Sequence, residues 1–246
     1  MADLTTQSHW DEAWSAPPRW RLPSGLLVGT RNIQRVLRRQ VRPGMHVLEL
    51  GCAPGKILAW TAVKLGARVS GLDYSEQGIA WSRRLFDTLG AAADLRREDV
   101  LKTSFPRDAF DLVYSWGLIE HFDDPRPFVR AHVELVRPGG LALIGVPHYG
   151  GMYGTLQASL DPANLALHNL HIMNPDALAA LAPPDLATAV RAYPAGRFSP
   201  WLLNLDRRLP GPVARLASYA LNGVGLLQPI DIAPLCPLLV LEMRRR

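Results

Sequence analysis

The first place in this sequence where chemistry could occur is a small-residue segment between two apolar ones. The residues around Glu49 predict a strand, and the chain then turns through Gly51, Ala53 and Gly55 before Ile57–Trp60 resumes with helical spacing. Glycines at both ends of this turn allow backbone angles and close approaches that a side chain would block, so a ligand can lie against the loop and the helix N-terminus. The segment predicts a nucleotide-binding loop.

The spacing of the loop argues against two common nucleotide motifs. A dinucleotide fingerprint needs a third glycine where the helix packs on the strand, and that place holds Lys56. A phosphate loop has the spacing GxxxxGK, with a glycine directly before the lysine and a Ser or Thr directly after the lysine. In this chain the residue after Lys56 is Ile57. The remaining pattern is acid-x-Gly-x-Ala-x-Gly.

A second acid follows the loop at the distance that a nucleoside site requires. The short apolar stretch Val69–Leu72 predicts a strand that ends at Asp73, about twenty residues after the loop. At the tip of a parallel strand its carboxylate can accept hydrogen bonds from ribose hydroxyls. Tyr74 can form a wall against an adenine.

These features resemble the class I S-adenosylmethionine-dependent methyltransferases, most specifically a bacterial small-molecule subgroup in which a Gly-Leu-Ile-Glu-His-Phe segment follows the fourth strand, as residues 117–122 do here. The turn at residues 137–140 also matches. The resemblance implies S-adenosylmethionine as cofactor, an adenine contact at Asp99 and the backbone of Val100, and pocket-facing residues at the end of the fourth strand. The expected cofactor-binding residues are Glu49, Gly51, Cys52, Ala53, Pro54, Gly55, Asp73, Tyr74, Asp99, Val100, Ser115 and Trp116.

Histidines on the later loops are the candidates for a catalytic base, because an imidazole titrates near neutral pH. We rank His121 first by position, followed by His168 and His148. The subgroup tends to carry Pro-Asn where this chain has Pro147-His148, so His148 is a departure that could change acceptor preference. For each of these histidines an ordinary packing or surface role is the alternative.

The elements that must position these residues alternate as strands and helices. Apolar runs predict strands near residues 47–50, 69–72, 91–97, 110–115, 141–146, 186–193 and 238–243, with helices at 57–65, 76–89 and 128–136. The resemblance implies an α/β fold, a Rossmann-like seven-stranded mostly parallel sheet with helices on both faces and a reversed last strand.

The length of 246 residues favours one methyltransferase domain spanning residues 1–246. Within it, residues 1–42 contain Trp10, Trp14 and Trp20 and predict an N-terminal helical cap, with simple docking of the chain end as the alternative. Residues 147–185 and 198–230 are expected to be substrate-side insertions or a lid.

Composition and charge limit the classes of binding partner that we expect. The net charge of +5 comes largely from arginine, notably a cluster on the polar face of one predicted helix and the last three residues, 244–246. Both clusters favour a solvated surface over nucleic-acid binding. Two distant cysteines suggest neither a disulfide framework nor a metal site. No secretory signal or membrane span is expected, and the predicted location is cytoplasmic, as a monomer or homodimer.

The predicted function is methyl transfer from S-adenosylmethionine to a hydroxyl, or an amine or carboxylate, of a small-molecule acceptor. The resemblance points to a natural-product or sugar-type metabolite. A noncatalytic S-adenosylmethionine-binding regulatory or partner protein is the main alternative. A nicotinamide-dependent oxidoreductase is disfavoured by Lys56.

Overall fold

The computed structural model describes residues 4–15 and 20–246, with the side chains of residues 7 and 8 outside the description. A seven-stranded sheet in the order β3-β2-β1-β4-β5-β7-β6 forms its centre. The strands are β1 His46–Leu50, β2 Arg68–Asp73, β3 Asp94–Arg97, β4 Phe110–Trp116, β5 Val136–Pro147, β6 Ala187–Ala195 and β7 Leu238–Arg245. Strands β1 to β5 pair in parallel, and β7 runs antiparallel between β5 and β6. This confirms the expected fold with its reversed last strand.

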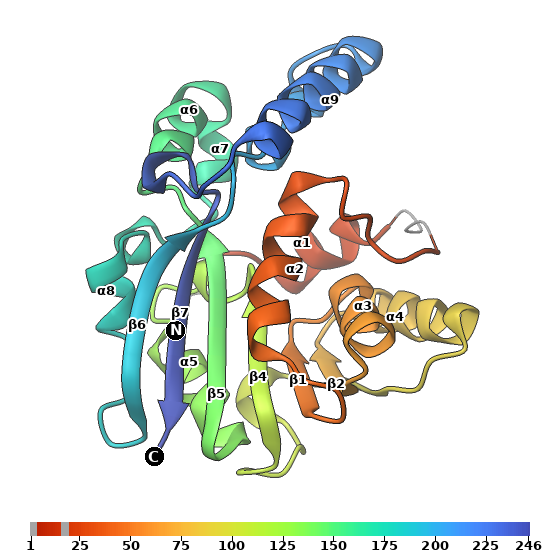
Figure 1. Ribbon diagram of the computed structural model, residues 1–246, viewed down its shortest axis with the longest axis vertical. Coiled ribbons are helices and arrows are strands. Elements are labelled where there is room, and N and C mark those ends of the chain that lie inside the picture. The colour runs from red at the N-terminus through yellow and green to blue at the C-terminus, as the bar shows by residue number, and fades with distance from the viewer. Residues whose placement is uncertain (1–3, 16–19) are drawn as a thin grey trace.

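Alternating side chains along the strands build one core on each face of the sheet. Leu48 and Val113 point into a core that contains helix α5 Arg126–Leu135 and helix α8 Pro175–Ala179. Val47 and Leu112 point into the other, with helices α2 Val28–Gln40, α3 Lys56–Leu65 and α4 Glu76–Leu89. Figure 1 shows α2 in front of the sheet and α5 behind it. Strands buried on both faces explain why their sequences are nearly continuous apolar runs.

Helix boundaries follow local chemistry. Ser75 caps α4 by accepting a hydrogen bond from the Gly78 amide, and Gly90 ends that helix in the left-handed conformation. Gly66 ends α3 in the same way. The bounds of α3 and α4 lie within one residue of the helices expected at 57–65 and 76–89.

Some boundaries differ from the expectation. The segment 137–140, expected as a free turn, lies inside the long strand β5, which begins at Val136 and pairs with Phe110 before a register shift. Strand β3 is shorter than expected and starts at Asp94. Before α5, His121 ends a single 3-10 turn, Ile119–His121.

The remaining helices gather at one end of the sheet. Helices α6 Met152–Leu160, α7 Pro162–Leu165 and α9 Gly211–Leu227 lie beyond that end in Figure 1. Helix α1 Gln7–Ala13 is capped by Thr6. Pro17 and Pro18, which follow this helix in the sequence, lie outside the described residues. None of the described helices combines the length and the apolar content that a bilayer crossing requires.

Candidate active site

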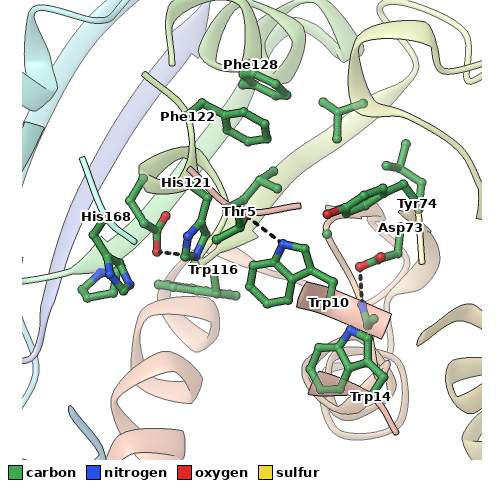
Figure 2. A pocket seen from close by; sticks show the side chains of 18 of the residues that line it. Thr5, Trp10, Trp14, Asp73, Tyr74, Trp116, His121, Phe122, Phe128 and His168 are labelled. Atoms are coloured by element: carbon green, nitrogen blue, oxygen red, sulfur yellow. Dashed lines mark hydrogen bonds and ion pairs between the residues drawn. The ribbon is translucent and has the colours of Figure 1, made fainter. Parts of the chain in front are cut away.

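A pocket of about 600 Å³ opens at the carboxyl ends of the parallel strands, where ligands bind in open α/β sheets. Two kinds of wall line it. One comes from the loops after β1, β2 and β3, and the other from the segment after β4 and the two later insertions. Figure 2 shows Asp73 and Tyr74 on one side, His121 and His168 on the opposite side, and Trp10 between them.

The glycine loop has the geometry that its sequence predicts. Gly51 has φ +71 and Gly55, which precedes α3, has φ +80. These positive angles favour glycine. The Ala53 amide donates to Asp73 Oδ2 at 3.1 Å, so the loop after β1 is fixed to the tip of β2.

Asp73 is buried beside the loop, with lone pairs left for a ligand. Its Oδ1 accepts from the Ser75 amide at 2.9 Å, and each carboxylate oxygen has room for a second donor. Burial raises the pKa of Asp73, and the hydrogen bonds from Ser75 and Ala53 partly offset that effect. The nearby Asp99 is exposed, and its Oδ1 accepts from the Leu101 amide at 2.9 Å.

The structure separates the expected cofactor residues into two groups. Those that line the pocket are Gly51, Ala53, Asp73, Tyr74, Asp99, Val100 and Trp116. Those absent from the lining are Glu49, Cys52, Pro54, Gly55 and Ser115. Glu49 is buried and accepts a hydrogen bond from the Tyr114 hydroxyl at 3.0 Å, while the Ser115 hydroxyl pairs with His132 Nε2 at 2.9 Å. Burial raises the pKa of Glu49 well above its ordinary value.

The three candidate histidines also divide into those that line the pocket and one that does not. His121 and His168 line the pocket with ring centroids 4.9 Å apart. His148 is absent from the lining, and its Nδ1 lies 3.0 Å from the Cys236 carbonyl oxygen. Burial lowers the pKa of His148 and of His168. It also lowers the pKa of His121 to about 4, with a further contribution from His168. Both pocket histidines are therefore neutral at physiological pH.

Glu120 is the main residue of the site to which the sequence analysis assigned no role. It is fully buried, it lines the pocket, and neither carboxylate oxygen makes a hydrogen bond within the described residues. Burial raises the pKa of Glu120 to about 8; the backbone N–H groups of Glu120 and Leu118 offset part of this effect without completing a hydrogen bond. A signal was present in the sequence, since an acid beside His121 inside an otherwise apolar segment is unusual.

The two expected insertions supply further walls. Tyr149 and Asn164 line the pocket from the first, with Asn164 Nδ2 donating to the Tyr149 hydroxyl at 3.3 Å, and Trp201, Leu202 and Asn204 line it from the second. The sequence placed these segments near the acceptor without identifying the residues. Aromatic residues are also common in surface loops that bind nothing. The spacing of these residues follows no period that would distinguish a binding role.

The N-terminal helix reaches the same pocket. Trp10 and Trp14 both line it, and the Trp10 ring packs edge-on against His121 at 5.0 Å between centroids. Outside the pocket, the Trp81 indole N–H donates to the Trp14 carbonyl at 2.9 Å and the Ser75 hydroxyl donates to Asp11 at 2.8 Å. These bonds fix α1 to the start of α4.

Comparison with known proteins adds a family match to this geometry. Residues 48–144 match a family model described as "Methyltransferase domain". Over 98 residues, the chain is 37% identical to a ubiquinone biosynthesis O-methyltransferase of Methylocella silvestris, covering 40% of this chain and 38% of that protein. Over 141 residues it is 30% identical to the protein of the same name from Bradyrhizobium diazoefficiens, covering 55% of each. The chain thus spans about two fifths to about half the length of these relatives.

Solved structures extend the likeness to the whole fold. A phosphoethanolamine N-methyltransferase 2 of Haemonchus contortus, in complex with S-adenosyl-L-methionine, aligns with a TM-score of 0.61 at 16% identity, covering 97% of this chain and 57% of that one. The [4+2]-cyclase SpnF aligns with a TM-score of 0.56 at 17% identity, covering 87% and 80%. At such identities these structures speak for the fold alone. Residues 48–144 match the methyltransferase domain in sequence, and the sheet that they help to build has the Rossmann-like fold of the class I methyltransferases.

Proposed function

We propose that this protein binds S-adenosylmethionine and transfers its methyl group to a nucleophilic group of a small molecule. One observation carries the proposal: the nucleotide-type loop and the histidine-lined chamber belong to a single continuous pocket. The sulfonium is itself a strong electrophile, so the protein mainly has to align donor and acceptor, exclude water and, for some nucleophiles, accept a proton.

The donor binds against the loop after β1. Gly51 and Ala53 leave room for the cofactor, Asp73 accepts hydrogen bonds from the ribose hydroxyls, and Tyr74, Asp99 and the backbone of Val100 surround the adenine. Outside the lining, four buried residues and the half-buried Pro54 support this cradle; the buried ones are Glu49, Cys52, Gly55 and Ser115. Their hydrogen bonds and packing keep the loop in place, as Glu49 does through Tyr114.

The acceptor binds at the opposite end of the pocket, beside Trp116. His121 and His168 lie there in the neutral form that a proton acceptor requires, and His121 stays the first candidate for that role. His148 is the weaker candidate because Cys236 holds its ring outside the lining. The names of the sequence relatives, which are O-methyltransferases, favour a hydroxyl as one acceptor group within this proposal. An amine or carboxylate acceptor, and a natural-product or sugar-type metabolite, belong to the same proposal.

A noncatalytic protein that binds S-adenosylmethionine is the second candidate. It stays a candidate because a protein named as a [4+2]-cyclase has this fold, so the fold alone does not determine methyl transfer. Both candidates predict cofactor binding. Only the enzyme predicts a methylated product and release of S-adenosylhomocysteine.

Calorimetric titration with S-adenosylmethionine, S-adenosylhomocysteine and NAD tests the cofactor assignment. We expect the first two to bind and NAD not to, because Lys56 occupies the place of the third dinucleotide glycine. Asp73→Ala removes charge-assisted hydrogen bonds and should weaken binding by about 1.5–3 kcal/mol. Binding of NAD with no binding of the sulfonium would refute the assignment. A mass-spectrometric screen for acceptors that gain one methyl group then separates the enzyme from the binding protein.

A further inference from the structure

Three side chains that can accept hydrogen bonds converge at the end of the pocket where the methyl acceptor is proposed to bind. One atom each from Glu120, His121 and His168 lie within 4.8 Å of one another. Glu120 Oε1 and His121 Nε2 are 3.9 Å apart. All three residues line the pocket, and in Figure 2 the two imidazoles lie at the end opposite Asp73. The cluster therefore lies in the wall at that end of the pocket, with the carboxyl oxygens of Glu120 buried.

The protonation of both imidazoles follows from their backbone partners. His121 Nδ1 lies 3.0 Å from the Leu167 carbonyl oxygen, and His168 Nδ1 lies 2.8 Å from the Asn164 carbonyl oxygen. A carbonyl oxygen only accepts, so each Nδ1 carries the proton in the neutral ring and donates it. Each Nε2 is left with a lone pair. The carboxyl group of Glu120 keeps an acceptor oxygen whether or not it is protonated, so the cluster offers acceptors on all three residues.

The two segments that carry the cluster are fixed to each other. The Asn169 amide donates to the Glu120 carbonyl at 2.7 Å, and Asn169 Nδ2 donates to the carbonyls of Phe122 and Asp123, both at 3.0 Å. The His121–Leu167 hydrogen bond joins the same segments. The acceptors are thus held in place before a ligand arrives, which lowers the cost of ordering them on binding.

Acceptors that converge in this way need a cationic ligand rich in donors. A buried carboxylate without a partner is costly, and a bound cation removes that cost. An ammonium nitrogen has three N–H donors, and acceptors about 2.7–2.9 Å from it in tetrahedral directions are about 4.4–4.7 Å apart. A metal with bonds of about 2.0–2.2 Å would bring tetrahedral ligands to about 3.3–3.6 Å. The 3.9 Å separation of Glu120 and His121 lies between these two ranges, and a small shift reaches either one. The aromatic side chains around the cluster, Trp10 on His121 and Tyr149 on His168, favour an organic ammonium over a metal ion.

We propose that Glu120, His121 and His168 bind the ammonium group of the methyl acceptor, which is therefore a primary amine. This inference rests on the proposed function and narrows its acceptor class. Aromatic side chains surround the cluster: Trp10 packs on His121 at 5.0 Å and Tyr149 packs on His168 at 5.0 Å, with Phe122 and Phe128 also in the lining. The amine accordingly carries an apolar, ring-sized body.

The same contacts prepare the amine for reaction. The ammonium gives one proton to the cluster, where Glu120, with a pKa of about 8, is a stronger base than His121, with a pKa of about 4, and this frees the nitrogen lone pair. That pair forms the new N–C bond to the methyl carbon while the C–S bond breaks, and its electrons neutralise the sulfonium to a thioether. The products are S-adenosylhomocysteine and a secondary ammonium ion. No other reactant is needed.

The test uses the full-length protein saturated with S-adenosylhomocysteine, so that binding is measured without turnover. Phenethylamine, tyramine and tryptamine are titrated beside their hydroxyl analogues 2-phenylethanol, tyrosol and tryptophol. We expect at least one amine to bind ten- to a hundredfold more tightly than its alcohol, and Glu120→Gln to abolish that preference. Phenethyltrimethylammonium, which has the charge without N–H donors, should bind no better than 2-phenylethanol.

Matched controls make each outcome decisive. Glu134→Gln removes a carboxylate from the surface, where it pairs with Arg107 and Arg130, and should retain the amine preference. His168→Gln, a second change in the cluster, should reduce the preference for the amine over its alcohol, as Glu120→Gln does. Circular dichroism confirms that each variant is folded. Equal binding of every amine and its alcohol, or a preference that survives Glu120→Gln, overturns the proposal. Tight binding of Zn²⁺ that both cluster variants abolish also overturns it, in favour of a metal site.

Failure of this inference is distinguishable from failure of the proposed function. If S-adenosylhomocysteine binds the wild-type protein and no amine is preferred, only the amine assignment fails. If neither S-adenosylmethionine nor S-adenosylhomocysteine binds, the proposed function itself fails. When an amine is preferred, incubation with S-adenosylmethionine should give a product with its new methyl group on nitrogen.

Discussion

At the residue scale, the fully buried carboxyl of Glu120 makes the stability of the protein depend on pH. Its pKa is about 8 in the folded protein against an ordinary value of 4.5. The folded state therefore holds this proton more tightly than the unfolded state. The contribution is fully present below about pH 4.5 and is lost as the pH rises through 8. At about 1.4 kcal/mol per pKa unit, the loss amounts to a few kcal/mol.

Glu120→Gln tests this dependence, because glutamine resembles the neutral acid. Urea unfolding at about pH 5 should give similar free energies for both proteins, whereas at about pH 9 the variant should be the more stable. Glu49 and Asp73 have raised pKa values as well, so both proteins should lose stability with rising pH, and only the difference between them reports Glu120. A difference that does not change with pH would mean that Glu120 finds a partner in solution.

Gly51 is a second residue at which one substitution tests the site, because it has a positive φ and lies at the pocket. At its φ of +71, a β-branched side chain costs roughly 1–2 kcal/mol, and a Cβ there would lie 3.3 Å from Leu118 Cδ1 at the pocket. We expect Gly51→Val to abolish binding of S-adenosylmethionine in a protein that still folds. Gly90→Val is the matched control, because Gly90 has φ +60 and open space around it. Circular dichroism and calorimetry on both variants separate backbone strain from loss of the cradle; normal binding by Gly51→Val would exclude this loop.

At the scale of elements, the sequence predicted the strands and helices better than their ends. Apolar runs and glycine stops were sufficient for α3, α4 and all seven strands, because local chemistry determines them. The extension of β5 back to Val136 depends on pairing with Phe110 across the sheet. The position of His148 likewise depends on Cys236, far along the chain. Such partners are invisible to a local pattern.

Helix α1 makes a testable contribution as a cap on the pocket, a role that stays a proposal. Trp10 lines the pocket and packs on His121, so Trp10→Ala should weaken binding of both cofactor and acceptor, by several-fold or more. Trp20→Ala is the matched control, since Trp20 packs on Trp81 at 5.3 Å and is absent from the lining. Calorimetry on both variants checks the difference. Equal effects of the two substitutions on binding would mean that α1 only docks the end of the chain on the core.

At the scale of the whole molecule, the pocket joins segments that are far apart in the chain. Its walls come from α1, from the loops after β1 to β4 and from both insertions. The sequence identified most of these segments separately, since each follows a recognisable strand. It did not reveal that Glu120 has no hydrogen-bond partner in the described part of the chain, or that the backbone fixes the tautomers of His121 and His168. Both facts arise only when residues 117–122 and 164–169 meet.

A ligand that touches all these segments should stabilise the entire fold. By mass action, S-adenosylhomocysteine at a hundredfold excess over its Kd adds about 2.7 kcal/mol. For a chain of 246 residues this corresponds to a rise in Tm of about 5–10 °C. Differential scanning calorimetry should show the rise as one cooperative transition, whereas NAD at the same concentration should leave Tm unchanged. Asp73→Ala at that same concentration should show a smaller shift, because its Kd is higher. A ligand-dependent second transition would mean that the walls of the pocket unfold independently, and the single-domain description would then fail.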